Sequence, residues 1–419
     1  MGNEINQGDL SKAGKRDGAA LRARPLPDSV LRLIWREHQI SRAEIARHMG
    51  LSRSTVTEIV NDLLQTGFVN EVGTAPSRGG RRPVVLEFQD KARCILGVDI
   101  GATHVSVALT DLRGRVLAWE EKVHPVRSDP EGTRALVFEL CDACLATLGE
   151  PRRLLSIGVA VPSPVDPLRP EWLSEVVIPA WQGRSELERL HQRYGVPVHV
   201  DNDANLGALA EHWWGAGLGV DDLIYIKMGY DIGAGYFLGG EIYRGARGIA
   251  GELGHLPINS NGKPCDCGLK GCLVTFVGAL ALEARASELL TGHPESMLAG
   301  KEATLTAIED AALAGDALGL QLVQETADYL GIAIVGWLNL MNPSMVVLGG
   351  GLARVGELLL QPLREKVQSC NLVNSVAATD IRTSELGPQA VAIGAATLAI
   401  EEAFAEPNFL RRGPRPGVL

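Results

Sequence analysis

The chain has 419 residues, 46% of them hydrophobic, and a formal net charge of −10 at pH 7. This length exceeds one ordinary core, so it predicts two or three domains, and the hydrophobic content suffices to bury them. No apolar stretch is long enough to cross a bilayer, because the longest, residues 330–341, contains Asn339 and stops before Pro343. Residues 1–24 are polar and lack the apolar centre of a secretory signal, so we expect a cytoplasmic protein without membrane contact.

Charge is distributed unevenly along the chain. Residues 1–90 contain 13 Lys and Arg against 11 Asp and Glu, whereas the remainder contains 27 against 39. An acidic body is repelled by phosphate, so any contact with DNA has to be made by the N-terminal part. In the reducing cytoplasm, the seven cysteines indicate metal or core positions, not disulfides.

Residues 25–90, which follow a flexible arm over residues 1–24, are expected to form a winged helix-turn-helix. The first helix has apolar residues at helical spacing, namely Val30, Leu31, Ile34 and Trp35. Ser41 and Glu44 form a capping box that opens a second helix, and a turn at Gly50 leads to Ser52 as the N-cap of a third.

The third helix has the character of a DNA recognition helix. Its apolar stripe consists of Val56, Ile59, Val60, Leu63 and Leu64. The opposite face is polar near the helix start, which a helix needs to reach base edges in the major groove. We therefore expect Arg53, Ser54 and Thr57 to contact DNA.

A wing is expected after this helix, formed by strands at residues 68–69 and 84–88. Its tip contains Arg78, Arg81 and Arg82 beside two glycines, a combination suited to a narrow minor groove. The alternative is a three-helix protein-interaction module with a solvated basic loop. The recognition helix and the basic wing together favour DNA binding.

From Cys94 onward, the pattern changes to short apolar strands that end in glycine turns. Strands of this kind are expected at residues 95–101, 105–111, 116–119, 156–162, 223–229 and 346–351. A glycine hairpin lets backbone amides approach a phosphate, and an aspartate beside it can hold a metal ion. Cys141 and Cys144 fall in an apolar helical segment and are expected in the core.

A cysteine cluster lies in a glycine-rich loop at residues 250–275. Cys265, Cys267 and Cys272, with His255 ten residues before the first, provide the three thiolates and one imidazole of a closed tetrahedral zinc site. The alternative is reduced cysteines packed in a loop, but so glycine-rich a segment has little apolar core. We expect a structural Zn²⁺, since no ligand position stays open.

The chain resembles the ROK family of repressors, open reading frames and sugar kinases over nearly all of residues 25–405. The residues that carry this resemblance are the segments 201–205 (Asp-Asn-Asp-Ala-Asn), 251–255 (Gly-Glu-Leu-Gly-His) and 265–272 (Cys-Asp-Cys-Gly-Leu-Lys-Gly-Cys). The resemblance implies an α/β, actin-like (ribonuclease H-like) ATPase fold. Its lobes would cover residues 93–200 and 201–405, with a tail at 406–419. A winged helix-turn-helix ahead of this body is similar to the repressor branch.

The resemblance also implies a sugar site. Residues that match Asn202, Asp203, Glu252 and His255 bind the sugar in the family kinases, and the residue at Asp203 is their catalytic base. His255 would then place one ring nitrogen on zinc and the other toward the sugar. Singly, each could be a solvated loop residue or a cap, but two matching clusters in order favour the site.

Two loops match the nucleotide loops of the family kinases, at Asp99, Gly101 and Thr103 and at Gly229 and Gly233, and both loops are degenerate. Ala102 adds a side chain where phosphate would approach, and His104 replaces a fixed cation with a mostly neutral ring. Asp231 at about 4 Å from a phosphate would cost about 4 kcal/mol at a dielectric near 20. The sequence therefore argues against ATP and Mg²⁺, and Val274, where the family commonly has Glu, leaves the sugar unidentified.

Three functions fit these patterns. The leading hypothesis is a transcriptional repressor of carbohydrate genes that binds operator DNA and a small-molecule sugar effector, as a homodimer or homotetramer. The second is an ATP-dependent sugar kinase that retains a DNA-binding arm. The third is a regulator controlled by a protein partner from sugar transport. The retained sugar residues favour the first over the third, and Asp231 and His104 count against the second.

Overall fold

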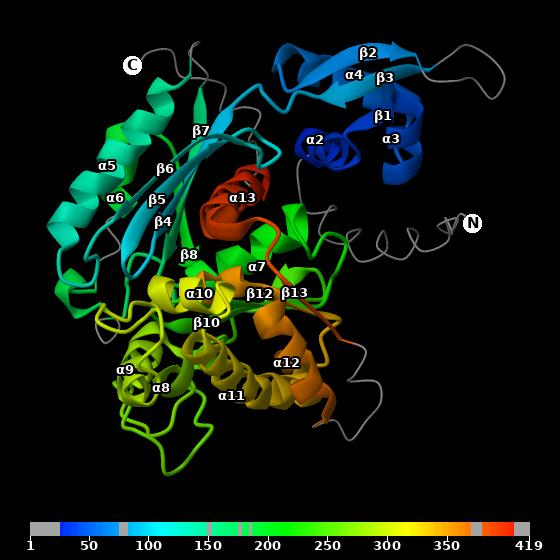
Figure 1. Ribbon diagram of the computed structural model, residues 1–419. Helices are drawn as coiled ribbons and strands as arrows, with labels where there is room; N and C mark the ends of the chain where they lie inside the picture. The colour runs from blue at the N-terminus through cyan, green and yellow to red at the C-terminus, as the bar shows by residue number, and fades with distance from the viewer. Residues whose placement is uncertain are drawn as a thin grey trace. The chain divides into compact units, whose positions relative to one another are not determined.

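The computed structural model describes residues 26–74, 83–148, 153–174, 178–183, 187–369 and 379–405, and Figure 1 labels their helices and strands. The chain divides into two compact units. Unit 1 contains the residues up to Cys94, together with Asp111–Arg113 and the residues from Ile400 onward. Unit 2 contains Ile95–Thr110 and Gly114–Ala399. Within the described residues, no helix is both long and apolar enough to span a membrane.

In the part of unit 1 that the structure describes, a group of helices near its N-terminus packs with a small sheet. The helices are α2 (Leu26–Glu37), α3 (Arg42–Met49) and α4 (Arg53–Gln65). The sheet has the order β1-β3-β2, with β1 (Gln39–Ser41), β2 (Val69–Thr74) and β3 (Val84–Phe88). The two strands of the wing are thus confirmed, although β2 extends further than expected. Strand β1, which pairs with β3, was not predicted from its three residues.

The helix boundaries in unit 1 follow from their caps. The Ser41 hydroxyl accepts from the Glu44 amide at 3.3 Å, and the Ser41 amide donates to Glu44 Oε2 at 2.9 Å, so the predicted capping box is confirmed. Gly50 ends α3 in the left-handed region, at a φ of 65°. Ser52 then caps α4 by accepting from the Thr55 amide at 3.1 Å.

Two distant segments complete the core of unit 1. The Trp35 indole donates to the Leu112 carbonyl at 2.9 Å, and Arg113 Nε donates to Asp90 Oδ1 at 2.9 Å. The Phe404 ring, near the end of α13 (Ala390–Ala405), lies 5.2 Å from the Trp35 ring. Nothing in the local sequence of residues 25–90 predicts these contacts.

Unit 2 contains two five-stranded sheets with the same topology. The first has the order β6-β5-β4-β7-β8, and its strands are β4 (Cys94–Ile100), β5 (His104–Thr110), β6 (Val116–Val123), β7 (Leu154–Val161) and β8 (Val198–Asn202). The second has the order β11-β10-β9-β12-β13, and its strands are β9 (Leu223–Met228), β10 (Ile232–Leu238), β11 (Glu241–Ile242), β12 (Met345–Gly350) and β13 (Asp380–Thr383). If the strands of each sheet are numbered from 1 to 5 in chain order, both sheets have the strand order 3-2-1-4-5. This repeat is the duplicated architecture of the actin-like fold.

Helices cover these sheets. Helices α5 (Pro130–Ala146) and α6 (Leu187–Tyr194) lie beside the first sheet in Figure 1, and α13 packs closely on two of its strands, β4 and β7. The remaining helices are α7 (Asp203–Trp214), α8 (Val274–Val277), α9 (Ala279–Leu289), α10 (Leu305–Leu313), α11 (Ala317–Met341) and α12 (Glu357–Ser369). The short 3-10 turns are Pro179–Trp181, Leu253–His255 (η3), Leu290–Gly292, Gly351–Val355 and Gly387–Gln389. Cys141 and Cys144 of α5 are fully buried, as predicted.

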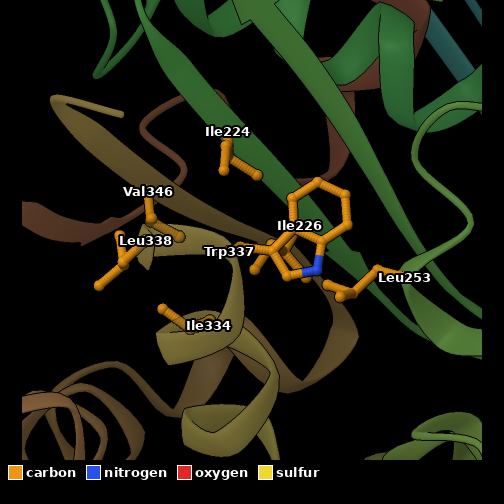
Figure 2. A pocket seen from close by; sticks show the side chains of 7 residues that line it. All are labelled: Ile224, Ile226, Leu253, Ile334, Trp337, Leu338 and Val346. Atoms are coloured by element: carbon orange, nitrogen blue, oxygen red, sulfur yellow. The ribbon is translucent and has the colours of Figure 1, made fainter. Parts of the chain in front are cut away.

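The two faces of the second sheet have different roles. Successive side chains of a strand alternate between faces, so Tyr225 packs with α7 whereas Ile224 and Ile226 pack with α11. On the α11 face a cavity of about 10 Å³ is lined entirely by apolar side chains (Figure 2). A space of that size holds at most one water molecule and offers it no polar partner. The α11 face is therefore core, and the candidate site residues Asn202 and Asp203 lie at the start of α7.

Candidate functional site

Asn202 is the N-cap of α7. Its Oδ1 accepts from the amides of Ala204 and Asn205 at 2.9 and 3.3 Å, and its Nδ2 donates to the Ser163 carbonyl at 3.3 Å. These bonds use most of what an amide side chain can offer. The Asn202 side chain therefore mainly stabilises the start of α7, and at most one of its N–H groups is left to bond a ligand.

Asp203, the first residue of α7, has both carboxylate oxygens bonded. Oδ1 accepts from the Ala204 amide at 2.7 Å, and Oδ2 accepts from Lys227 Nζ at 2.5 Å. The Asp203 side chain is 10% exposed and that of Lys227 is 18% exposed. Burial works against the charge of Lys227, but Asp203 and Asp99 outweigh it and raise the pKa of Lys227 above its usual range.

Close packing of α7 on the second sheet brings this pair together. Lys227 pairs with Gly233 across the β9–β10 hairpin. At Gly235, a Cβ atom would lie only 2.1 Å from the Ala204 carbonyl oxygen, so any other residue would push away the first turn of α7. Glycine at position 235 therefore allows Asp203 to reach the ammonium group of Lys227.

The loop that contains Glu252 and His255 lies along β10. The Ala234 amide donates to the Gly251 carbonyl at 2.8 Å, which fixes the entry to η3. Glu252 is accessible to solvent, yet partial burial, followed by the charges of Asp203 and Asp231, raises its pKa to about 7. The charges of Asp203 and Asp231 thus act on Glu252, and the charge of Asp203 also acts on Asp231.

The four predicted metal ligands lie together. The side-chain ligand atoms of His255, Cys265, Cys267 and Cys272 are all within 4.8 Å of one another. His255 Nδ1 is 3.5 Å from Cys265 Sγ, and Cys267 Sγ is 3.6 Å from Cys272 Sγ. Zinc bonds of about 2.1 Å to nitrogen and about 2.3 Å to sulfur, at tetrahedral angles, require ligand separations of about 3.5–3.8 Å. The donor set and its spacing therefore fit a metal ion of this kind.

The first nucleotide-type hairpin is closed by its own histidine. His104 Nε2 is 3.2 Å from Asp99 Oδ2. A Cβ atom at Gly101 would lie 2.3 Å from the His104 ring, so this ring covers the glycine where a phosphate would approach. Thr103 is exposed beside it.

One expectation about this hairpin needs correction. The sequence predicted a mostly neutral ring at His104. Burial does disfavour the charged ring, but the hydrogen bond and charge of Asp99 outweigh it and raise the pKa of His104. His104 therefore behaves as a partner for Asp99 and carries more positive charge than a free imidazole at the same pH.

The second hairpin is also tied internally. Asp231 Oδ2 is 3.1 Å from Arg127 Nη1, and the Arg127 guanidinium lies 5.4 Å from the Tyr230 ring centroid. The Gly229 amide donates to the Asp231 carbonyl at 3.2 Å. Sequence reasoning found Asp231 but missed Arg127 and Lys227. A lysine within the otherwise apolar strand at residues 223–228 was a signal that could have revealed Lys227.

The start of α4 presents the residues expected to contact DNA. Arg53, Ser54 and Thr57 are exposed, while Val56, Ile59, Val60 and Leu63 on the other side are buried. Arg78, Arg81 and Arg82 of the wing lie outside the described residues. The structure thus presents a polar face at the start of α4.

Comparison with known proteins identifies the family. The model of the ROK family matches residues 95–402, which is most of the chain, and the model of the MarR family matches residues 29–71. The chain belongs to the ROK family. With a winged helix-turn-helix ahead of the ROK domain, it is a DNA-binding transcriptional regulator of that family.

Individual relatives agree with this assignment. The xylose repressor of Caldicellulosiruptor bescii is 32% identical over 389 residues, which covers 91% of this chain and 96% of the relative. The crystal structure of a ROK family transcriptional regulator, a homologue of the E. coli Mlc protein, aligns with a TM-score of 0.75 and 27% identity over 89% of this chain and 94% of that one. A ROK family glucokinase from Streptomyces griseus, in complex with glucose and AMPPNP, aligns with a TM-score of 0.65 and 29% identity over 74% of this chain and 99% of its own. The regulators thus cover more of this ROK protein than the kinase does.

Proposed function

We propose that this ROK regulator represses carbohydrate genes by binding operator DNA through α4 and the wing, and that a sugar at the start of α7 controls this binding. Two observations support the proposal: Glu252 interacts electrostatically with Asp203 at the start of α7, and His255, three residues after Glu252, belongs to the metal-ligand cluster, in a family whose regulators include a xylose repressor. Carboxylates and an imidazole on one side of a site suit the hydroxyl groups of a polyol, which need acceptors.

The charges around this site favour a neutral ligand. Asp203 and Asp231 both act on the charge of Glu252, and among the described residues the lysine and the arginine that bond to this group are already paired, Lys227 with Asp203 and Arg127 with Asp231. A sugar phosphate would add negative charge to this acidic group. We therefore assign an unphosphorylated sugar as the ligand class.

A structural Zn²⁺ fits the cluster described above. Cys265, Cys267 and Cys272 would hold the ion together with His255 Nδ1, which leaves Nε2 as the nitrogen that can face the ligand. When bound, the ion supplies a fixed cross-link for residues 250–275 and orients the ring. Each of these four residues would then help to hold the loop at residues 250–275 in place.

The remaining assignments rest on the family pattern. Arg53, Ser54 and Thr57 would read the major groove, and Arg78, Arg81 and Arg82 the minor groove. A homodimer or homotetramer would suit paired half-sites in an operator. The DNA-binding domain would consist of residues 25–90, the first lobe of residues 93–200 and the second lobe of residues 201–405. The kinase alternative is weaker, because both oxygens of Asp203 are already bonded within the protein.

A ligand screen tests the proposed function. Thermal unfolding of the full chain would be measured with neutral pentoses, hexoses and amino sugars, each next to its phosphate ester. A true ligand raises the melting temperature with increasing concentration by mass action. We expect a response to a neutral sugar and none to its phosphate, and the same sugar should change the affinity for DNA from the promoter of the regulated genes. A response to phosphate esters alone would overturn the neutral-ligand assignment.

A matched pair of variants tests the DNA-binding surface. Changing Arg81 and Arg82 together to Ala should weaken binding to all DNA sequences and flatten its salt dependence by about two ions. Arg285→Ala removes a guanidinium that is paired with Glu325 in unit 2 and should leave the salt dependence unchanged. If DNA affinity depends on salt concentration equally in the wild type and the double variant, the wing does not contact DNA phosphates.

A further inference from the structure

The repeated topology of unit 2 places Asp99 and Lys227 at equivalent positions. Each lies on the first strand of its sheet, two residues before the glycine that opens the following hairpin, Gly101 in one case and Gly229 in the other. One half of the repeat thus presents a carboxylate, and the other half presents an ammonium group at the matching position.

These two groups lie in an environment that requires a balance of charge. Asp99 is 2% exposed, and its Oδ1 has no hydrogen-bond partner among the described residues. The Lys227 ammonium bonds to Asp203 and interacts electrostatically with Asp99. Two buried carboxylates without a nearby cation would be strongly unfavourable. Lys227 is therefore a cation that interacts with two buried carboxylates, Asp99 and Asp203.

Other charged groups nearby have partners of their own. His104 bonds to Asp99 Oδ2, and Arg127 bonds to Asp231. Glu252 adds negative charge on the outer side and has a raised pKa because of it. Oxygen-rich clusters of this kind, with two or more carboxylates, are the surroundings in which proteins hold Mg²⁺ or Mn²⁺. In this chain a lysine side chain supplies the positive charge.

We propose that Lys227 is an internal counter-ion for Asp99 and Asp203, which takes the place of a metal cation beside these carboxylates and so prevents a divalent metal ion from binding there. The Asp203 carboxylate is then held in a fixed orientation, and the domain receives its ligand without a metal–nucleotide complex. This role goes beyond the regulatory function, because it holds whichever ligand the domain binds.

Manganese binding to the purified, full-length protein tests the proposal. Lys227→Met removes the charge but keeps the length of the side chain, so Asp99 and Asp203 lose the cation with which they interact. We expect this variant to bind Mn²⁺ at least about 100-fold more tightly than the wild type, and to gain thermal stability from it. Titration followed by electron paramagnetic resonance of free Mn²⁺ measures the affinity directly.

Matched variants make the result specific. Lys122→Met removes an exposed lysine that is paired with Glu139, and it should create no manganese site. Asp203→Asn combined with Lys227→Met should lose the new site. If Lys227→Met does not fold, Lys227→Gln retains a donor for Asp203 without the charge, and it should show the same gain.

Two outcomes would overturn the proposal. One is a wild-type protein that binds Mn²⁺ as tightly as the lysine variants do, since Lys227 would then not exclude the ion. The other is a folded Lys227→Met or Lys227→Gln protein without any gain in Mn²⁺ affinity. Failure of the sugar screen would leave both measurements unaffected, so the two proposals can fail separately.

Discussion

Two regions of the ROK domain use their polar side chains in opposite ways. In the loop at residues 251–272, Glu252 is accessible, and His255 with three cysteines forms a set of ligand atoms that fits an ion. In the two glycine hairpins, by contrast, the charged groups are bonded within the chain: His104 to Asp99 of the same hairpin, and Asp231 to Arg127, which lies between β6 and α5. The first region is arranged to bind something from outside the chain, whereas the second region is neutralised from within.

This difference shows how a fold shared with kinases can be kept for sensing. A phosphoryl-transfer site needs open backbone amides and a metal ion beside the phosphates. Here the His104 ring covers Gly101, and Lys227 holds Asp203. The groups proposed to recognise the sugar are present, while charged groups in the hairpins proposed for the nucleotide are bonded within the chain.

The largest effect should come from removing a cysteine of the metal cluster. Cys267→Ser should lose the metal and, with it, the response to ligand, because binding energy at a structural site is also folding energy for its loop. Elemental analysis and thermal unfolding measure the two effects. The winged domain should keep its affinity for DNA, since its core is formed by other residues.

A second cysteine serves as the control for this change. Cys144 is buried in α5, and its thiol lies 3.6 Å from the Val107 carbonyl oxygen. Cys144→Ala should lower stability by about 1–2 kcal/mol through lost packing and leave the metal content unchanged. If the purified wild-type protein contains no metal, the cluster of His255 and the three cysteines is not a metal site.

Asp203 bonds to Lys227 and also acts on the charge of Glu252, so its substitution tests both regions. Asp203→Asn should weaken ligand binding by at least about tenfold, the usual loss for a hydrogen bond to a charged group. DNA affinity without ligand should stay the same, because Asp203 can act on the DNA only through the bound ligand. Isothermal titration with the sugar and a DNA-binding assay separate the two effects.

The same variant decides between sensing and catalysis. A coupled assay with ATP and the bound sugar should show absent or very slow phosphorylation in the wild type. Asp231→Asn, which removes the carboxylate bonded to Arg127, is the control for charge and should retain part of the ligand response. Turnover of several sugars per second that is lost in Asp203→Asn would make the protein a kinase.

The sequence predicted the features that depend on local spacing. The caps at Ser41 and Ser52, the buried face of α4 and the grouping of the cysteines each depend on residues close in the chain. The ion pairs could not be predicted, because Arg127 and Asp231 are 104 residues apart and meet only through the fold. Lys227 and Asp203 meet because Gly235 admits α7, which depends on strand register and helix position together.

The smallest expected effect concerns the internal bond between His104 and Asp99. Because the folded-state pKa of His104 is raised above its ordinary value of 6.5, its contribution to stability is full below that pH and declines as the pH rises through the folded-state pKa. Burial raises the pKa of Asp99, but His104 and Lys227 outweigh burial and lower it. The contribution of the His104–Asp99 pair to stability is therefore also lost as the pH falls through the folded-state pKa of Asp99. Glu121 adds a further charge near His104.

His104→Gln tests this balance, since glutamine can still donate to Asp99 but has no charge. It should lower the free energy of unfolding by roughly 1 kcal/mol at about pH 5.5 and by less at about pH 9. Urea unfolding at both pH values measures the difference. In an Asp99→Asn background the same substitution should show little dependence on pH, because the partner charge is gone. An equal loss at both pH values would mean that His104 acts through packing over Gly101, and the hairpin would then be closed by shape alone and not by charge.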